Sequence, residues 1–182
     1  MPEQVFPLTW KSDEQQQMLS EVRRFCEETL RPRVATMDRE GVLDREILQH
    51  LFDMGLMGID VPEEYGGSGM TFTDAILVIA ELARVDPSVS VVCDVQNTLV
   101  NNAIFRWGTE EQRRTWLPTL TSGTVGAYAL SEAESGSDAF SLRARAVREG
   151  DGWSLTGNKL WITNGYEAGL YLVFANANPE AG

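Results

Sequence analysis

The chain has few of the residues from which many catalytic and metal sites are built. Its 182 residues include one histidine, His50, and two cysteines, and only Lys11 and Lys159 are lysines. A single histidine disfavours a Ser-His-Asp triad or a histidine general base within this chain. No cysteines and histidines are grouped at metal-ligand spacing, so we expect no metal site.

Long apolar runs are missing as well. No run reaches the roughly twenty residues needed to cross a bilayer, and residues 1–7 have neither the basic start nor the apolar core of a targeting segment. Cys26 and Cys93 lie in apolar helical patterns, which favours buried thiols over a disulfide. We therefore expect a soluble, intracellular protein. Because arginine supplies almost all of the positive charge, we favour a bacterial cytoplasm, or the mitochondrial matrix if the source is eukaryotic.

Acidic residues outnumber basic ones, and the formal net charge is −12. This balance disfavours nucleic acid as a partner, because phosphate backbones are bound by basic surfaces. Hydrophobic residues make up 43% of the chain, which is enough to bury a core.

The first two thirds of the sequence has the apolar periodicity of helices. Polar N-cap residues precede several of the apolar stretches, and Pro32 should interrupt the first helix because proline cannot continue the hydrogen-bond ladder. We expect helices from Ser12 or Asp13 to about residue 30, from Asp44 to Gly55, over 75–84 with Thr73 as N-cap, over about 89–107, and from Thr109 onward.

After about residue 120 the apolar pattern changes to a period near two, which indicates strands. Apolar or alternating runs occur at 125–130, 142–148 and 170–175, and Gly150–Gly152 predicts a hairpin turn. Trp161 is expected on a further short strand.

These patterns predict an α+β fold with two parts. Residues 1–120 would form an all-α helical bundle. Residues 121–182 would form the start of an antiparallel β-barrel-like domain.

Two segments of the second part carry groups suited to a flat, phosphate-bearing cofactor. The run Tyr128–Asp138 passes from an apolar strand into small hydroxyl residues, whose N–H and O–H groups can bind phosphate or the polar edge of a ring. The run Lys159–Asn164 adds an aromatic face and a hydroxyl. Each has an ordinary alternative, because Ser, Gly and Asp also favour simple turns and Trp161 could belong to the core.

In residue type and order these segments resemble two motifs of the acyl-CoA dehydrogenases. Ala129–Asp138 resembles the first signature of that family, and Leu160–Gly165 resembles its flavin-face segment. One departure is Glu134, where the signature usually has glycine or another small uncharged residue. The resemblance is greatest to the short/branched-chain subfamily, and it extends upstream through Gly55–Ile59, Pro62–Gly67, Glu81–Asp86 and Val95–Val100.

The resemblance implies FAD as the cofactor, with its ring against the β domain. Backbone groups of Tyr128 and Leu130 would contact the ring edge, and Ser131 would donate to the N1 and O2 side. Ser137 would reach the FAD pyrophosphate and the CoA part of the substrate. Trp161 would pack on the ring, and Ile162 and Thr163 would border N5 and O4.

The implied activity is α,β-dehydrogenation of a short or 2-methyl-branched acyl-CoA to the 2-enoyl-CoA, in fatty acid metabolism or branched-chain amino acid catabolism. Electrons would pass to electron-transfer flavoprotein, and the complete enzyme would be a homotetramer.

The general-base glutamate is expected beyond Gly182, in a C-terminal helical-bundle domain that this chain lacks. No catalytic residue is therefore assigned, and the chain alone is expected to be inactive. We interpret Glu132 as a brace of its loop. Four residues at helical spacing could line the acyl pocket, with ordinary core packing as the alternative: Val92, Val95, Gln96 and Leu99.

Other functions remain open at this level. The same fold could support an acyl-CoA oxidase or a flavin monooxygenase, which differ in how the reduced flavin meets oxygen. The chain could also be a non-catalytic fragment or subunit that needs a partner domain. Arg143, Arg145 and Arg148 are interpreted as the solvent side of a strand, with steering of CoA phosphates as the alternative.

Overall fold

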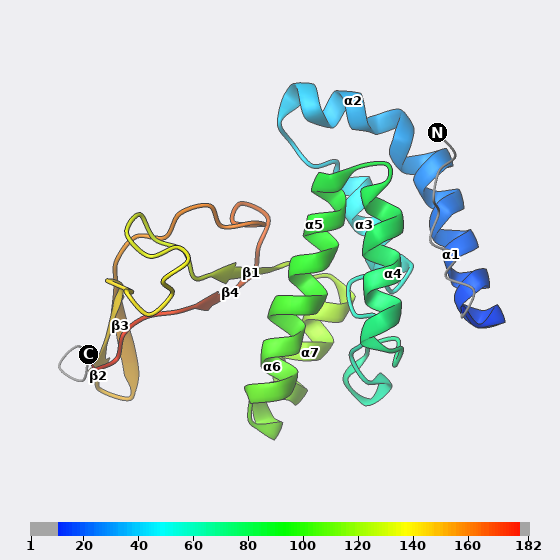
Figure 1. Cartoon of the computed structure of the whole chain (residues 1–182). Helices are drawn as coiled ribbons and strands as arrows, with labels where there is room; N and C mark the ends of the chain where they lie inside the picture. Colours follow the sequence, from blue (N-terminus) through cyan, green and yellow to red (C-terminus); the bar gives the residue numbers. More distant parts are fainter. Residues whose placement is uncertain (1–10, 179–182) are drawn as a thin grey trace.

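The computed structural model describes residues 11–178, which form a helical part followed by a smaller part of strands and loops (Figure 1). The α+β class, with the helical bundle first, is confirmed. The helical part consists of α1 (Asp13–Phe25), η1 (Cys26–Leu30), α2 (Arg31–Glu40), α3 (Arg45–Asp53), η2 (Glu63–Tyr65), α4 (Phe72–Ala83), α5 (Pro87–Asp94), η3 (Val95–Asn101), α6 (Asn102–Trp107) and α7 (Glu110–Ser122). The strands are β1 (Gly126–Ala129), β2 (Arg145–Glu149), β3 (Gly152–Thr156) and β4 (Leu170–Val173).

The first helix begins where the sequence predicts, because Ser12 and Gln15 form a capping box. The predicted interruption at Pro32 is wrong, since α1 continues through the π-helical segment η1 into α2. In this wider turn the Arg31 N–H donates to Cys26 O, five residues back. Pro32 is the second residue of α2, directly after η1, so the wider turn lies beside the residue that has no backbone N–H.

The start of α4 also differs from the prediction. The N-cap is Thr71, whose hydroxyl accepts from the Asp74 N–H while the Asp74 carboxylate accepts from the Thr71 N–H. Thr73 lies inside the helix and is exposed. The caps predicted at Asp44 and Thr109 are confirmed.

Helices α5 and α6 form one long rod, since the π-helical segment η3 joins them without a break. Two asparagines of η3 bind the loop that follows α3. Asn97 Oδ1 accepts from the Ile59 N–H at 2.8 Å, and Asn101 Nδ2 donates to Met57 O at 2.9 Å. Both asparagines are fully buried, so their amides satisfy backbone groups that water cannot reach.

The larger core lies between α1, α3, α4 and α5 and includes Leu30, Ile47, Leu51 and Leu82, all without exposed surface. Both cysteines lie in it as buried free thiols, as predicted. A second cluster connects η3 and α7 to the start of the β part.

The β part begins with β1, which leaves the helical part beside η3 (Figure 1). Strands β2 and β3 form the predicted hairpin around Gly150 and pair antiparallel. Strands β1 and β4 pair in parallel, with Gly126 opposite Leu170. The segment between them returns to the start of β1, because the N–H groups of Gly169 and Leu170 both donate to Val125 O.

Within residues 11–178, no helix is long and apolar enough to cross a membrane, and no acidic, histidine and cysteine side chains are grouped as metal ligands.

Candidate functional site

The two segments that the sequence singles out lie side by side. The backbone of Ser131 accepts a hydrogen bond from the Leu160 N–H at 2.9 Å. One residue earlier, Leu130 O accepts from the Lys159 ammonium at 2.9 Å. These bonds join the end of β1 to a segment 29 residues further along the chain.

The Glu132 carboxylate lies at this junction. Its Oε1 accepts from Lys159 Nζ at 2.7 Å and from the Ala144 N–H at 3.0 Å, and its Oε2 accepts from the Arg143 N–H at 2.7 Å. The Glu132 side chain is only 6% exposed. The hydrogen bond from Lys159, followed by the two amides, lowers the pKa of Glu132 to about 2. Glu132 is thus a braced anion and not a group ready to take up a proton.

The serine-rich run after β1 is a compact turn. The backbones of Glu132 and Ser135 pair with each other, and Ser135 Oγ donates to Asp138 O at 2.9 Å. Asp138 also accepts from Ser141 Oγ. The segment therefore has the local hydrogen bonds of a simple turn, which is the alternative to a cofactor-binding loop. Ser137 is exposed and Ser131 is half-buried.

Glu134, the departure from the family signature, forms an ion pair with Arg143. Arg143 is exposed, as predicted, but it does not belong to a strand, since β2 begins at Arg145. The extra negative charge near the serine turn is therefore compensated locally.

The prediction of a strand at Trp161 is wrong, because this residue lies in an irregular turn with φ of 57°. Such a backbone is strained for a bulky side chain. Packing against a hydrophobic core does not explain this backbone conformation, since the Trp161 side chain is 93% exposed. Ile162 and Thr163, next in the chain, are half-buried.

Asn164 holds this turn in place. Its backbone is also left-handed, with φ of 63°, and its side chain is 8% exposed. Asn164 Nδ2 donates to Gly126 O at 3.0 Å, at the first residue of β1. The hydroxyl of Tyr171 on β4 adds a hydrogen bond to Gly165 O at 2.8 Å. Sequence reasoning did not single out Asn164 for this role, because its partner lies 38 residues away.

The structure places the four residues predicted to line an acyl pocket in different surroundings. Val95 is buried in the second core cluster, and Leu99 is 37% exposed. Gln96 is fully buried: its amide donates to Leu120 O at 2.7 Å and Thr124 O at 3.0 Å, and accepts from the Gly126 N–H at 2.7 Å. These contacts favour the core-packing alternative for Gln96.

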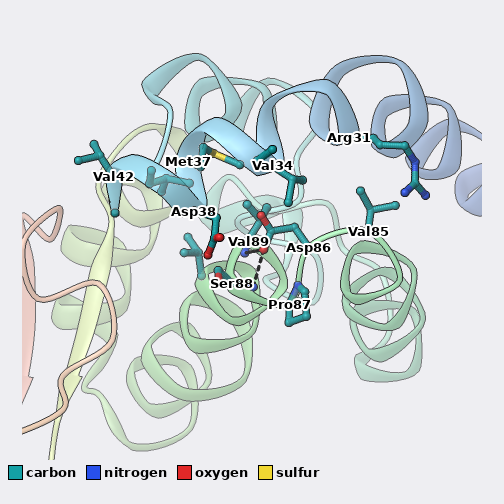
Figure 2. A pocket seen from close by; sticks show the side chains of 14 residues that line it. Arg31, Val34, Met37, Asp38, Val42, Val85, Asp86, Pro87, Ser88 and Val89 are labelled. Atoms are coloured by element: carbon teal, nitrogen blue, oxygen red, sulfur yellow. Dashed lines mark hydrogen bonds between the residues drawn. The ribbon is translucent and has the colours of Figure 1, made fainter.

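Val92 lines a cavity of about 690 Å³ between α2 and the start of α5 (Figure 2). Val34, Met37 and Val89 contribute apolar surface, and Asp86 caps α5 by accepting from the Ser88 N–H at 2.7 Å. None of the β-part residues discussed above lines this cavity.

A second cavity, of about 700 Å³, lies between α6, α7 and β4. Its lining includes Trp107, which is 85% exposed, and Trp116. Sequence reasoning did not separate these tryptophans from core residues, because helical spacing alone does not show which face a partner element covers.

Chemically, the junction of the two segments presents neutral donors and an aromatic face. The Glu132 carboxylate is engaged by Lys159 and two amides, so its charge is balanced within the chain. The hydroxyls of Ser131 and Ser137 and the exposed indole of Trp161 suit a planar group with polar edges and a phosphate.

Two family models match the chain. The model described as "Acyl-CoA dehydrogenase, N-terminal domain" matches residues 12–124, and "Acyl-CoA dehydrogenase, middle domain" matches residues 127–182.

Similar proteins point in the same direction. A "Probable short/branched chain specific acyl-CoA dehydrogenase" of Dictyostelium discoideum is 50% identical over 97% of this chain and 43% of its own length. The mitochondrial short/branched chain specific acyl-CoA dehydrogenase of Rattus norvegicus is 44% identical over 97% of this chain and 41% of its own length.

A solved glutaryl-CoA dehydrogenase from Mycobacterium smegmatis, in complex with FADH2, superposes with a TM-score of 0.89 at 31% identity. It covers 95% of this chain, which covers 45% of that structure. The chain thus spans less than half the length of these relatives.

Proposed function

The chain belongs to the acyl-CoA dehydrogenase family, and we propose that it supplies the flavin-facing part of a FAD-dependent short/branched-chain acyl-CoA dehydrogenase. The observation that carries the proposal is the direct pairing of the two family segments, Ser131 O with the Leu160 N–H at 2.9 Å. The identities of 50% and 44% to short/branched-chain enzymes support the subtype.

The residues present fit FAD. Its pyrophosphate is anionic and its ring is planar with polar edges, and the junction offers the hydroxyls of Ser131 and Ser137, a carboxylate paired with Lys159 and an open indole. An indole held in a strained backbone and left 93% exposed has the form of a preorganised stacking surface.

We assign the following contacts on that basis. Backbone groups of Tyr128 and Leu130 meet the ring edge, and Ser131 donates to its N1 and O2 side. A donor at this place stabilises negative charge that develops on the ring. Trp161 packs on the ring while Ile162 and Thr163 border N5 and O4, and Ser137 binds the pyrophosphate and the CoA part of the substrate.

Bound FAD would supply the acceptor for the hydride that leaves the β-carbon of the acyl-CoA. The residues of this chain bind and orient the two reactants and exclude water from one side. Val92, Val95, Gln96 and Leu99 stay a proposal for the acyl pocket, with Gln96 the weakest member because its amide is used within the chain.

The general base is not assigned to Glu132, because a carboxylate with a pKa of about 2 is a poor acceptor for an α-proton. We propose that this glutamate lies outside the 182 residues, that electrons pass to electron-transfer flavoprotein, and that the complete enzyme is a homo-oligomer. The chain alone would bind FAD without reducing it.

Titration of the purified chain with FAD tests the proposal. We expect a yellow complex that survives gel filtration and quenched flavin fluorescence, with Trp161→Ala weakening the binding. Adding a 2-methyl-branched acyl-CoA should leave the flavin oxidised. A chain that stays colourless at high FAD concentration would refute flavin binding, and bleaching by acyl-CoA would refute the absence of the base.

A further inference from the structure

One ion pair ties together both segments of the proposed flavin site. Glu132 follows Ser131 directly, and Lys159 precedes Trp161 by two residues. The Lys159 and Glu132 side chains are 12% and 6% exposed, and the distance between Nζ and Oε1 is 2.7 Å. The pair is therefore shielded from water, unlike the other ion pairs of residues 11–178, each of which has at least one partner 29% or more exposed.

Backbone groups around the pair determine which position carries the negative charge and which carries the positive charge. Glu132 also accepts from the N–H groups of Arg143 and Ala144, so a cation could not replace it. Lys159 also donates to Leu130 O, so an anion could not replace it. The contacts bring three separate stretches of chain, at 130–132, 143–144 and 159, to one point.

Stability alone is a poor explanation for such a pair. Removing two charges from water costs several kcal/mol in general, and apolar residues of similar volume often stabilise a fold as well or better. What apolar packing does not supply is a fixed direction and spacing, because hydrogen bonds to charged groups are short and oriented.

We propose that Glu132 and Lys159 are a pair of positioning residues that set the spacing between the Ser131 donors and the Trp161–Thr163 face. This inference rests on the proposed function, since it assigns the spacing to flavin binding. Without the pair, the bond between Ser131 O and the Leu160 N–H would remain as the direct backbone connection at this point.

The pair is tested by Lys159→Met and Glu132→Gln in the full 182-residue chain. The matched controls are Lys11→Met, which removes the other lysine of the chain, and Glu149→Gln on the exposed end of β2. Circular dichroism in the far ultraviolet first establishes that each variant is folded. If Lys159→Met does not fold, Glu132→Gln decides, because its amide oxygen still accepts hydrogen bonds.

Hydrogen exchange without FAD is the first measurement. We expect the Leu160, Arg143 and Ala144 amides to exchange faster in both test variants and to be unchanged in both controls. If these amides exchanged at the wild-type rate in the folded test variants, the ion pair would not be holding the two segments together, and the proposal would be overturned. This result does not depend on flavin binding.

FAD affinity and the visible circular dichroism of bound FAD are the second measurement. We expect about tenfold weaker binding in the test variants, equivalent to about 1.4 kcal/mol, and altered flavin bands at saturation. A role in stability alone would lower the unfolding midpoint but leave affinity and saturated bands as in the wild type, and that outcome overturns the proposal. If the wild-type chain binds no FAD, the proposed function fails and the positioning role fails with it. The exchange data still show whether the ion pair holds the two segments together.

Discussion

Gln96 connects the helical part to the β part, and its replacement by methionine should be severely destabilising. The side chain has no exposed surface, and its amide makes three hydrogen bonds to backbone groups of Leu120, Thr124 and Gly126. Methionine is similar in size but pairs with none of them. The bonds to Leu120 O and from the Gly126 N–H are buried, and each buried backbone group left without a partner costs about 1–3 kcal/mol.

Relief from burying the amide itself offsets part of that cost, so we expect the free energy of unfolding to fall by about 3–5 kcal/mol. Urea denaturation followed by tryptophan fluorescence measures it. Gln17→Met, at an exposed site on α1, is the matched control and should change stability by less than about 0.5 kcal/mol.

A loss below about 1 kcal/mol for Gln96→Met would refute the reasoning, because it would mean that water or movement satisfies the three backbone groups. The same variant separates the two interpretations of this residue. If Gln96 contacted acyl-CoA instead, the substitution would weaken acyl-CoA binding to the complete enzyme while leaving stability almost unchanged.

Three further predictions follow from the site and the core. Trp161→Ala should leave the unfolding free energy within about 0.5 kcal/mol of the wild type in urea denaturation, because the side chain is 93% exposed, while FAD binding weakens. Burial raises the pKa of Cys26 to about 11 and of Cys93 to about 12, so neither thiol should react with a thiol reagent at pH 8 until the chain is unfolded. The pKa of Glu132 is lowered from 4.5 to about 2, so its stabilising contribution is complete above about pH 4.5 and is lost as the pH falls towards 2. The difference in unfolding free energy between wild type and Glu132→Gln should therefore shrink over that interval. A difference that stays constant with pH would contradict this prediction.

Helix starts were predictable where one polar side chain both ends the preceding loop and accepts from the new helix. Asp44 accepts from the Glu46 N–H, and Thr109 accepts from the Gln112 N–H. Thr71 was missed in favour of Thr73 because its capping box uses Asp74, where the common pattern has Glu or Gln. Two threonines on either side of Phe72 are equally good candidates by type, and only the hydrogen bonds distinguish them.

The two π-helical segments could not be predicted from local pattern. Apolar spacing near 3.6 residues fits the rod from Pro87 to Trp107 whether or not one stretch is wider. Its wider stretch, η3, carries Asn97 and Asn101, which bind Leu56, Met57 and Ile59 about forty residues earlier. The parallel pairing of β1 with β4 could not be predicted from local pattern either, since the register of distant strands depends on the segment that connects them.

The turn at Trp161 shows why a candidate site was partly predictable. The sequence of Lys159–Asn164 showed the residue types of a stacking face, but its period-two pattern predicted a strand. In a strand, Trp161 and Ile162 would point to opposite faces. The structure instead has two left-handed residues, Trp161 and Asn164, each costing of order 1–3 kcal/mol. The buried bond from Asn164 Nδ2 to Gly126 O helps to offset that cost. A fold that only needed to bury tryptophan would gain nothing from this arrangement, because the indole is 93% exposed. What the strained turn produces is an exposed aromatic surface, which is the form that the proposed flavin contact requires.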